Sequence, residues 1–130
     1  MKLAILNDTH CGIRNSSEIF LDNAEDFYTN IFFPECEKRG VKQILHLGDY
    51  YDHRKFVNFK ALNQNRRVFL EPLRKKNMVM DIIPGNHDTY YKNTNELNSL
   101  KECLGHYMNE IHIVMEPTVM QYGSLSMGLL

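Results

Sequence analysis

The sequence lacks several features that define whole classes of protein. No uninterrupted apolar run approaches the roughly 20 residues that a bilayer crossing requires, so we expect no membrane span. The 130 residues contain no internal repeat, no low-complexity tract and no Gly/Ser/Pro-rich linker, which favours one domain. Neither sign of charge dominates, with 15 Lys and Arg against 16 Asp and Glu, and 43% of the residues are hydrophobic. This composition disfavours a disordered chain.

Cysteine is also scarce. Cys11, Cys36 and Cys103 are odd in number and irregularly spaced, which argues against a disulfide framework and for reduced thiols in a cytosol. The N-terminal apolar stretch gives way to polar residues after Leu6, too soon for a secretory signal. These observations predict a cytoplasmic protein.

The apolar pattern predicts alternating strands and helices. Strands are expected at 3–6, 41–47, 78–83, 111–115, 118–121 and 124–129, and helices at 16–39, 58–76 and 95–108. The last two strands are expected to form a hairpin through Tyr122 and Gly123. The order β-α-β-α-β-α-β-β-β predicts an α/β sandwich on a parallel sheet with right-handed crossovers.

Local signals refine the first strand and the first helix. The continuous apolar run 3–6 is typical of a strand buried on both faces. Ser16 or Ser17 is the expected helix cap, and Gly40 is the expected stop. Pro34 is expected to kink this helix or to divide it in two.

Unusual polar residues follow the first three predicted strands. The three motifs are Asp8-Thr9-His10, Gly48-Asp49-Tyr50-Tyr51-Asp52 and Gly85-Asn86-His87-Asp88. The carboxyl ends of parallel strands meet at one edge of a sheet, where α/β proteins build their sites. Carboxylate, imidazole and amide groups that converge there predict a metal site of nitrogen and oxygen ligands.

Each motif offers a distinct ligand. Asp8 and His10 lie two residues apart, so an extended backbone presents both side chains to one ion. Asp49 has two oxygens and can bridge two ions, and Asn86 offers a carbonyl oxygen to the second. His87 can stay unligated, to hydrogen-bond to a substrate or to protonate a leaving group. Two ions about 3.5–4 Å apart would clamp a phosphate and activate water for in-line attack.

Each motif also has a plain structural explanation. Asp-x-His after a strand commonly forms a turn or a helix cap, and Gly-Asp is a common turn dipeptide. Gly-Asn makes ordinary tight turns as well. The joint occurrence of three suitable motifs at successive strand ends favours the metal site.

These motifs resemble the first three signatures of the calcineurin-like metallophosphoesterases. Within that superfamily, the stretches around them are most similar to phage recombination endonuclease subunits, relatives of the SbcD-type DNA-repair nucleases. The resemblance is good from Met1 to about Asn93 and loose beyond.

The resemblance implies a role for each matching residue. Asp8 and His10 would bind the first metal ion, Asp49 would bridge, and Asn86 would bind the second. His87 and Asp52 would belong to the catalytic machinery: His87 at the scissile phosphate or leaving group, Asp52 orienting its neighbours without binding an ion. Two divalent ions are implied, Mn²⁺ first and Mg²⁺ as a substitute. The implied partners are DNA and an SMC-like ATPase subunit, with a homodimer as a further option.

The sequence departs from this family after the third motif. Family members add a single His and then a Gly-His-x-His signature, whereas only His106 and His112 follow here, and Met108 stands where the second His of the signature belongs. We therefore expect residues 1–130 to be the N-terminal part of a catalytic domain, incomplete at its C-terminus.

Basic residues concentrate between Arg54 and Lys76, where eight Lys and Arg accompany one acidic residue, Glu71. This segment could follow a nucleic-acid backbone, or it could be an ordinary solvated helix face. Arg54 and Lys55, next to the second motif, are the better candidates for substrate contact, and His53 is a further one. His46, inside a predicted strand, is expected to be a hydrogen-bonded core residue.

The leading hypothesis is a metal-dependent phosphodiesterase that cleaves DNA in recombination or repair. Two alternatives stay open. One is another metallophosphoesterase, such as a protein phosphatase or a small-molecule phosphodiesterase. The other is a non-catalytic fragment that binds metal or nucleic acid.

Overall fold

A computed structural model describes residues 1–52, 58–84, 104, 107 and 109–129 of the chain. The strands are β1 (Leu3–Leu6), β2 (Gln43–His46), β3 (Val79–Ile82), β4 (Ile111–Ile113), β5 (Thr118–Tyr122) and β6 (Leu125–Leu129). The helices are α1 (Ile13–Ser16), α2 (Glu18–Phe27), α3 (Phe33–Arg39), α4 (Phe59–Asn65) and α5 (Glu71–Lys75). Two π-helical segments, η1 (Tyr28–Phe32) and η2 (Arg66–Leu70), join α2 to α3 and α4 to α5.

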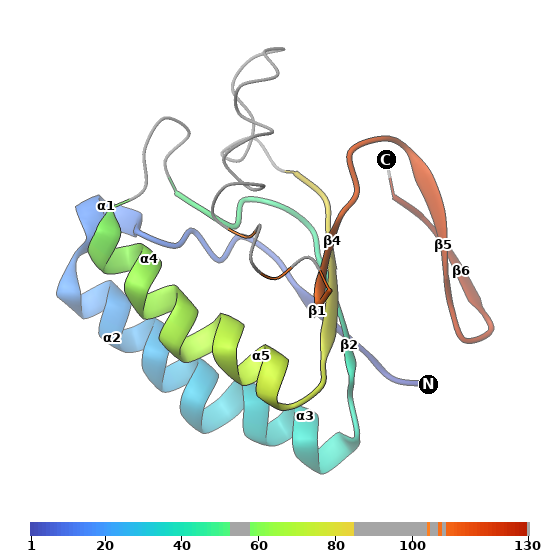
Figure 1. The fold of residues 1–130 in the computed structure, drawn as a ribbon, viewed down its shortest axis with the longest axis horizontal. Coiled ribbons are helices and arrows are strands. Elements are labelled where there is room, and N and C mark those ends of the chain that lie inside the picture. Colours follow the sequence, from blue (N-terminus) through green and yellow to red (C-terminus); the bar gives the residue numbers. More distant parts are fainter. Residues whose placement is uncertain (53–57, 85–103, 105–106, 108, 130) are drawn as a thin grey trace.

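The first four strands form one parallel sheet in the order β1-β2-β3-β4. Helices lie along one face of this sheet, and the antiparallel β5–β6 hairpin lies on the other side (Figure 1). Successive crossovers of one hand between neighbouring parallel strands place their helices on the same face. The predicted α/β class and its parallel sheet are confirmed.

Each of the two long helices passes through a π-helical segment just before a proline. Pro34 follows η1 by two residues, and Pro72 follows η2 by two residues. Proline lacks a backbone N–H, and the wider π turn accommodates the missing hydrogen bond, so that the chain continues as helix. Pro34 therefore divides the first helix into α2 and α3, as predicted, without ending it.

The predicted helix boundaries are also observed. Ser17 occupies the position before α2, although its side chain makes no capping hydrogen bond. Gly40 ends α3 with φ of 69°, a left-handed conformation that favours glycine. Asn58 precedes α4, and its side chain accepts a hydrogen bond from the backbone N–H of Lys60 at 2.7 Å.

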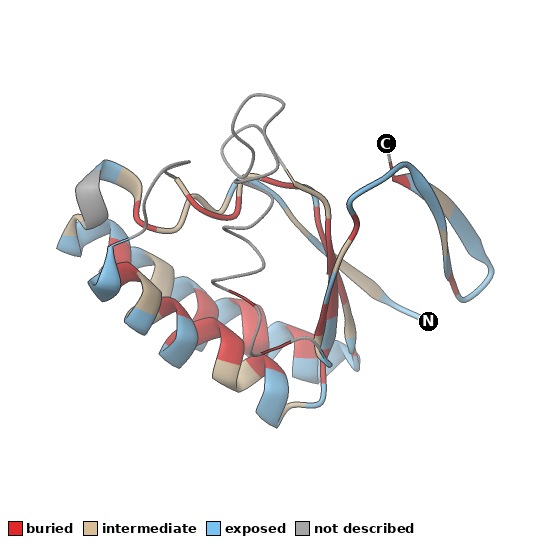
Figure 2. Cartoon of the chain, turned by 45° about the horizontal axis from the view of Figure 1, so that its top comes forward, coloured by how far each residue is buried: buried red, intermediate tan, exposed pale blue. Residues whose placement is uncertain are grey.

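The main core lies between the helices and the sheet. The ring centroid of Phe69 lies 4.9 Å from that of Tyr28 and 5.8 Å from that of Phe33, so the two π-helical regions meet around one aromatic group. Ile44 and Met80 close this core from the sheet side. Buried residues accordingly line the inward faces of both helices (Figure 2).

A second, smaller core lies between the sheet and the hairpin. It contains Leu45, Val114, Tyr122 and Leu129. The Tyr122 hydroxyl donates a hydrogen bond to Oδ2 of Asp81 in β3 at 2.7 Å, which fixes the hairpin to the centre of the sheet. This buried polar contact was not predicted from the sequence.

Two expectations about the elements differ from the structure, and a third falls outside the described residues. The expectation that strand 3–6 is buried on both faces is wrong, because β1 forms an edge of the sheet and Ile5 is 55% exposed. The hairpin turn lies one residue later than predicted, since Tyr122 still pairs with Leu125. The helix predicted at 95–108 falls almost entirely outside the described residues.

Among the described residues, no helix is long and apolar enough to cross a membrane.

Candidate metal centre

The chain segments after β1 and β2 run side by side beyond the ends of their strands. The backbone N–H of Asp8 donates to the carbonyl oxygen of Gly48 at 3.2 Å, and that of His10 to Asp49 at 3.0 Å. The N–H of Cys11 continues the pattern to Tyr50 at 2.7 Å. The parallel pairing of the sheet therefore extends through the first two motifs and sets their relative position.

The three candidate ligands share an uncommon backbone conformation. Asp8, His10 and Asp49 have φ values of 51°, 44° and 54°, all in the left-handed region. Asp, Asn and His are enriched there among non-glycine residues, and such residues gather at functional sites. The left-handed turns allow both segments to curl over the sheet edge while keeping their backbone hydrogen bonds.

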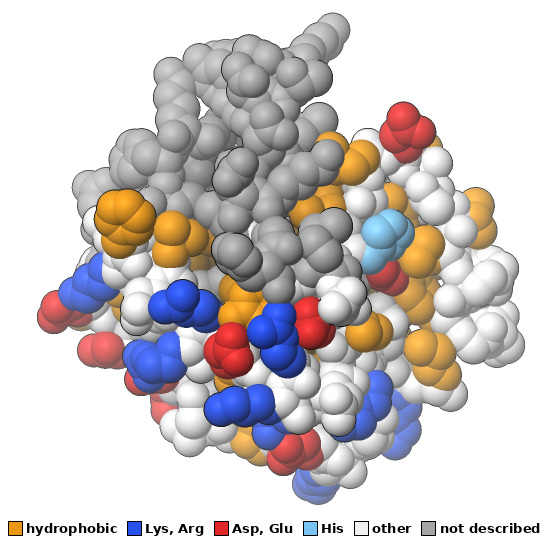
Figure 3. Space-filling model, viewed as in Figure 1, with side chains coloured by type: hydrophobic (Ala, Val, Ile, Leu, Met, Phe, Trp, Pro, Cys, Tyr) orange, Lys and Arg blue, Asp and Glu red, His pale blue; other side chains and the backbone are white. Residues whose placement is uncertain are grey.

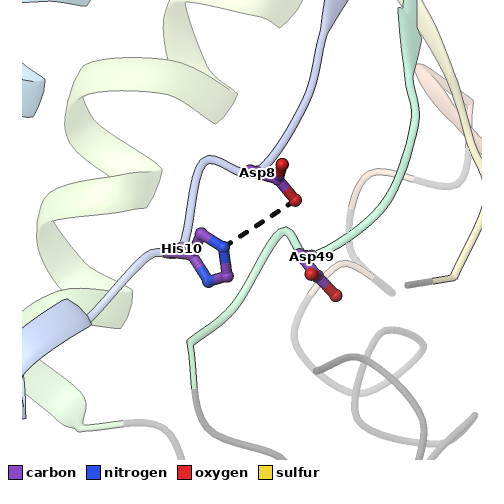
Figure 4. A group of neighbouring side chains, drawn as sticks. All are labelled: Asp8, His10 and Asp49. Carbon is purple, nitrogen blue, oxygen red and sulfur yellow. Dashed lines mark ion pairs between the residues drawn. The ribbon is translucent and has the colours of Figure 1, made fainter. Parts of the chain in front are cut away.

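These turns bring together the side chains of Asp8, His10 and Asp49. Each contributes one potential ligand atom, and these atoms all lie within 4.8 Å of one another. Nε2 of His10 lies 3.8 Å from Oδ1 of Asp8 (Figure 4). Across the described parts of the chain, this is the one group of three or more His, Cys, Asp and Glu residues with such spacing.

Neighbouring polar groups contact these side chains. Nδ1 of His10 lies 3.3 Å from Oδ1 of Asp52, on the opposite side of the ring from Asp8. Asn7 donates from Nδ2 to Oδ2 of Asp8 at 3.0 Å. Asp8 is 55% exposed in its side chain, while His10 and Asp52 are 22% and 18% exposed. The group is therefore open to solvent at Asp8, whereas His10 and Asp52 are largely covered by the protein.

The donor set fits a divalent cation. Two carboxylates and one imidazole are the ligands expected for ions such as Mn²⁺, and no thiolate is needed. A ligating imidazole commonly directs its second nitrogen toward a carboxylate, as His10 does toward Asp52. The residues present thus suit a metal ion of the kind that the sequence predicts.

His46 is a hydrogen-bonded core residue, as predicted. Its side chain is fully buried, Nε2 lies 2.9 Å from Oγ1 of Thr9, and Nδ1 accepts from the N–H of Gly48 at 3.1 Å. Burial lowers the pKa of His46 to about 4. Sequence reasoning did not assign a role to Thr9, although its place between Asp8 and His10 was a signal.

The two tyrosines of the second motif are packing residues. Tyr50 and Tyr51 are each 1% exposed, so neither ring is available for stacking on a base. Asn65 of α4 donates from Nδ2 to the Tyr50 hydroxyl at 2.7 Å. The second motif is thereby tied to the helix layer.

Four of the six basic residues between Lys60 and Lys76 are paired with acids. Four ion pairs join Lys60 to Glu18, Arg67 to Glu25, Arg74 to Glu110 and Lys76 to Glu37. Figure 3 accordingly shows the two signs of charge interspersed on this face. Among these basic residues, the pairing favours a solvated helix face over a strip that follows nucleic acid.

The other predicted site residues lie outside the described residues. They are Asn86 and His87 of the third motif, and His53, Arg54 and Lys55 after the second. Asp8, His10, Asp49 and Asp52 are the predicted site residues that the structure brings together.

Two known proteins resemble this chain, one in sequence and one in fold. The chain is 26% identical over 134 residues to exonuclease subunit 1 of Enterobacteria phage T4, and it spans 38% of that protein's length. Its fold is similar to the crystal structure of Pseudomonas putida nuclease MPE, with a TM-score of 0.58 and 20% identity. That similarity covers 92% of this chain and 50% of the nuclease.

Residues 1–123 match the calcineurin-like phosphoesterase family. This match includes all three motifs and every residue of the candidate metal-ligand group. The resemblance inferred from the motifs is confirmed, and the chain belongs to the calcineurin-like phosphoesterase family.

Proposed function

We propose that this chain is part of a metal-dependent nuclease that hydrolyses phosphodiester bonds in DNA. The observation that carries the proposal is the convergence of Asp8, His10 and Asp49 at the carboxyl end of the parallel sheet. The similarity to a phage exonuclease subunit over the full length of the chain supports DNA as the substrate.

In this proposal, Asp8 and His10 would hold a first divalent ion, Asn86 would hold a second, and Asp49 would contribute to both. Mn²⁺ is the proposed ion, with Mg²⁺ as a substitute. When bound, the two ions would stabilise negative charge on the phosphoryl group and lower the pKa of water.

The remaining residues orient groups and move protons. We assign Asp52 to hold the proton of His10 at Nδ1, which lies 3.3 Å from its Oδ1, so that the lone pair of Nε2 would be available to the first ion. We assign His87 to the scissile phosphate or the leaving-group oxygen, where an imidazole can donate a hydrogen bond or a proton.

DNA contact is assigned to Arg54, Lys55 and His53, which follow the second motif directly. The paired cations Lys60, Arg67, Arg74 and Lys76 are not part of this assignment. Since the chain spans 38% of its phage relative, the activity of the whole protein and its association with an SMC-like ATPase belong to the proposal as well.

Calorimetric titration with Mn²⁺, followed by hydrolysis assays on the same chain, tests the proposal. Asp49→Asn is the sharpest variant, because Asn tolerates the left-handed backbone at this position and removes only the charge. We expect Mn²⁺ binding by the parent chain and loss of at least about tenfold in affinity in the variant. Asp22→Asn, on the exposed face of α2, is the matched control and should bind as the parent does.

The substrate is tested by comparing DNA, a phosphopeptide and a simple phosphodiester. Preferential Mn²⁺-dependent cleavage of DNA supports the proposal. Preference for the phosphopeptide or the simple diester would reassign the chain to another phosphoesterase activity. Metal binding without any turnover would contradict catalysis by this chain.

A further inference from the structure

The imidazole of His46 has one hydrogen-bonding arrangement that satisfies both ring nitrogens. The backbone N–H of Gly48 can only donate, so Nδ1, at 3.1 Å, must accept and carries no proton. Nε2 of the neutral ring therefore carries the proton and donates to Oγ1 of Thr9 at 2.9 Å. The Thr9 hydroxyl in turn donates to the carbonyl oxygen of Tyr50 at 3.2 Å.

This chain of hydrogen bonds connects the two segments that carry the candidate ligands. Thr9 lies between Asp8 and His10, and Gly48 directly precedes Asp49. The ring of His46 therefore links both segments, which Figure 4 shows with their candidate ligands. No candidate ligand takes part in these side-chain bonds, so they act on the ligands through the backbone.

The surroundings hold the ring in this state. His46 is fully buried at the end of β2, and burial lowers its pKa to about 4, so that it is neutral near pH 7. Its ring centroid lies 5.2 Å from that of Tyr50, which is itself held by Asn65 of α4. His46 and Tyr50 are buried and Thr9 is half-buried, and a side-chain network whose members are all hydrogen-bonded is rigid.

We propose that His46, acting with Thr9, is a positioning residue that fixes the distance between the Asp8–His10 segment and Asp49. The inference rests on the proposed metal site and adds a determinant of its affinity. We call the hydrogen bonds of His46 to Thr9 and Gly48 the His46 bridge. Without this bridge, the backbone hydrogen bonds between the segments remain, but the left-handed turns lose their side-chain support. Metal affinity should then fall even where the chain stays folded.

Variants at both ends of the bridge test this role. His46→Asn keeps an acceptor near the Nδ1 position and loses the donor to Thr9, whereas His46→Gln keeps a donor near the Nε2 position and loses the acceptor. Thr9→Val removes the hydroxyl at nearly constant volume, and Thr9→Ser retains it. We expect Mn²⁺ affinity to fall at least about tenfold in both His46 variants and in Thr9→Val. Thr9→Ser should stay within about threefold of the parent.

Melting temperature in EDTA separates positioning from simple stability. Val41→Ala is the control, because Val41 is 7% exposed and lies before β2, at the opposite end of that strand from the site. It should lower the melting temperature without changing Mn²⁺ affinity. If the His46 and Thr9→Val variants behave in the same way, with lower melting temperature and unchanged affinity, the positioning role is overturned.

Nitrogen-15 NMR of the imidazole tests the inference without metal and without a variant that could misfold. We expect His46 in the parent chain to be the neutral tautomer protonated at Nε2. Protonation at Nδ1 would overturn the proposed bridge. Failure of the parent chain to bind Mn²⁺, with the Nε2–H tautomer observed, would instead contradict the proposed metal site and remove the positioning role with it.

Discussion

Nδ1 of His10 lies 3.3 Å from Oδ1 of Asp52, while Nε2 of the same ring is turned toward Asp8. A carboxylate on one side of an imidazole fixes which nitrogen carries the proton and which keeps its lone pair. Asp52 is 18% exposed in its side chain, so solvent screens this contact only in part. The relationship suits an imidazole that binds a cation through Nε2.

Replacing Asp52 by Asn should weaken metal binding without removing a ligand. The amide can no longer stabilise the Nδ1–H tautomer by charge, so we expect Mn²⁺ affinity to fall by about 10- to 100-fold. Isothermal titration of the variant and the parent chain measures this loss. Asp22→Asn provides the charge-matched control on α2, and equal affinity in Asp52→Asn and the parent would contradict the orienting role.

Stability of the metal-free chain should fall with acidity because of His46. The pKa of this ring is about 4 when folded, below the ordinary 6.5 of the unfolded chain, so protons bind preferentially to the unfolded state. The contribution of His46 is complete above pH 6.5 and is lost as the pH falls toward 4. We expect about 2 kcal/mol lower unfolding free energy at pH 5 than at pH 7.5.

Urea denaturation in EDTA at the two pH values measures that difference. His46→Asn has no titrating ring, so its unfolding free energy should lack this part of the pH dependence. An unchanged difference between the two pH values in the variant would assign the effect to other groups.

Tyr122→Phe should loosen the hairpin from the sheet. The variant removes the 2.7 Å hydrogen bond to Asp81 and leaves that buried carboxylate with less compensation. We expect a loss of about 1–3 kcal/mol in unfolding free energy, measured by chemical denaturation. Gln121→Ala changes an exposed position of the same strand and should stay within about 0.5 kcal/mol of the parent.

DNA binding should depend more on Arg54 than on Arg67. Arg67 is already paired with Glu25 and contributes little charge to phosphate contact, so Arg67→Gln should hardly change the salt dependence of DNA binding. Arg54→Gln should reduce the slope of log affinity against log salt by about 0.9. Fluorescence anisotropy with labelled duplex DNA, in an Asp49→Asn background that limits cleavage, measures both slopes. Equal reductions in the two variants would contradict this assignment.

Apolar periodicity predicted most of the described fold. The strands at 3–6 and 79–82 and the helix that follows Asn58 lie where the pattern places them, because their burial follows from local repeats. Exposure of Ile5 was not predictable in this way. It depends on which strand forms the sheet edge and on how far the hairpin reaches, and both are set by contacts distant in sequence.

The sequence predicted the candidate ligands of the site, but it did not predict the hydrogen bonds that hold their segments in place. Asp8, His10 and Asp49 were found because they follow strands whose ends meet at one edge. The bridge from His46 to Thr9 spans 37 residues and depends on which ring nitrogen faces Gly48. No periodic pattern in the sequence predicts a contact of that kind. The same holds for the hydrogen bond between Tyr122 and Asp81.

The left-handed backbone at Asp8, His10 and Asp49 limits how this site can change by mutation. Val, Ile and Thr are strongly disfavoured at such φ values, whereas Asn, Asp, His and Gly are tolerated. A library randomised at the three positions would therefore be filtered by backbone geometry before any selection for metal or substrate. The surviving variants would differ mainly in charge and ligand type, so altered ion preference is a more accessible outcome of laboratory evolution here than a redesigned pocket shape.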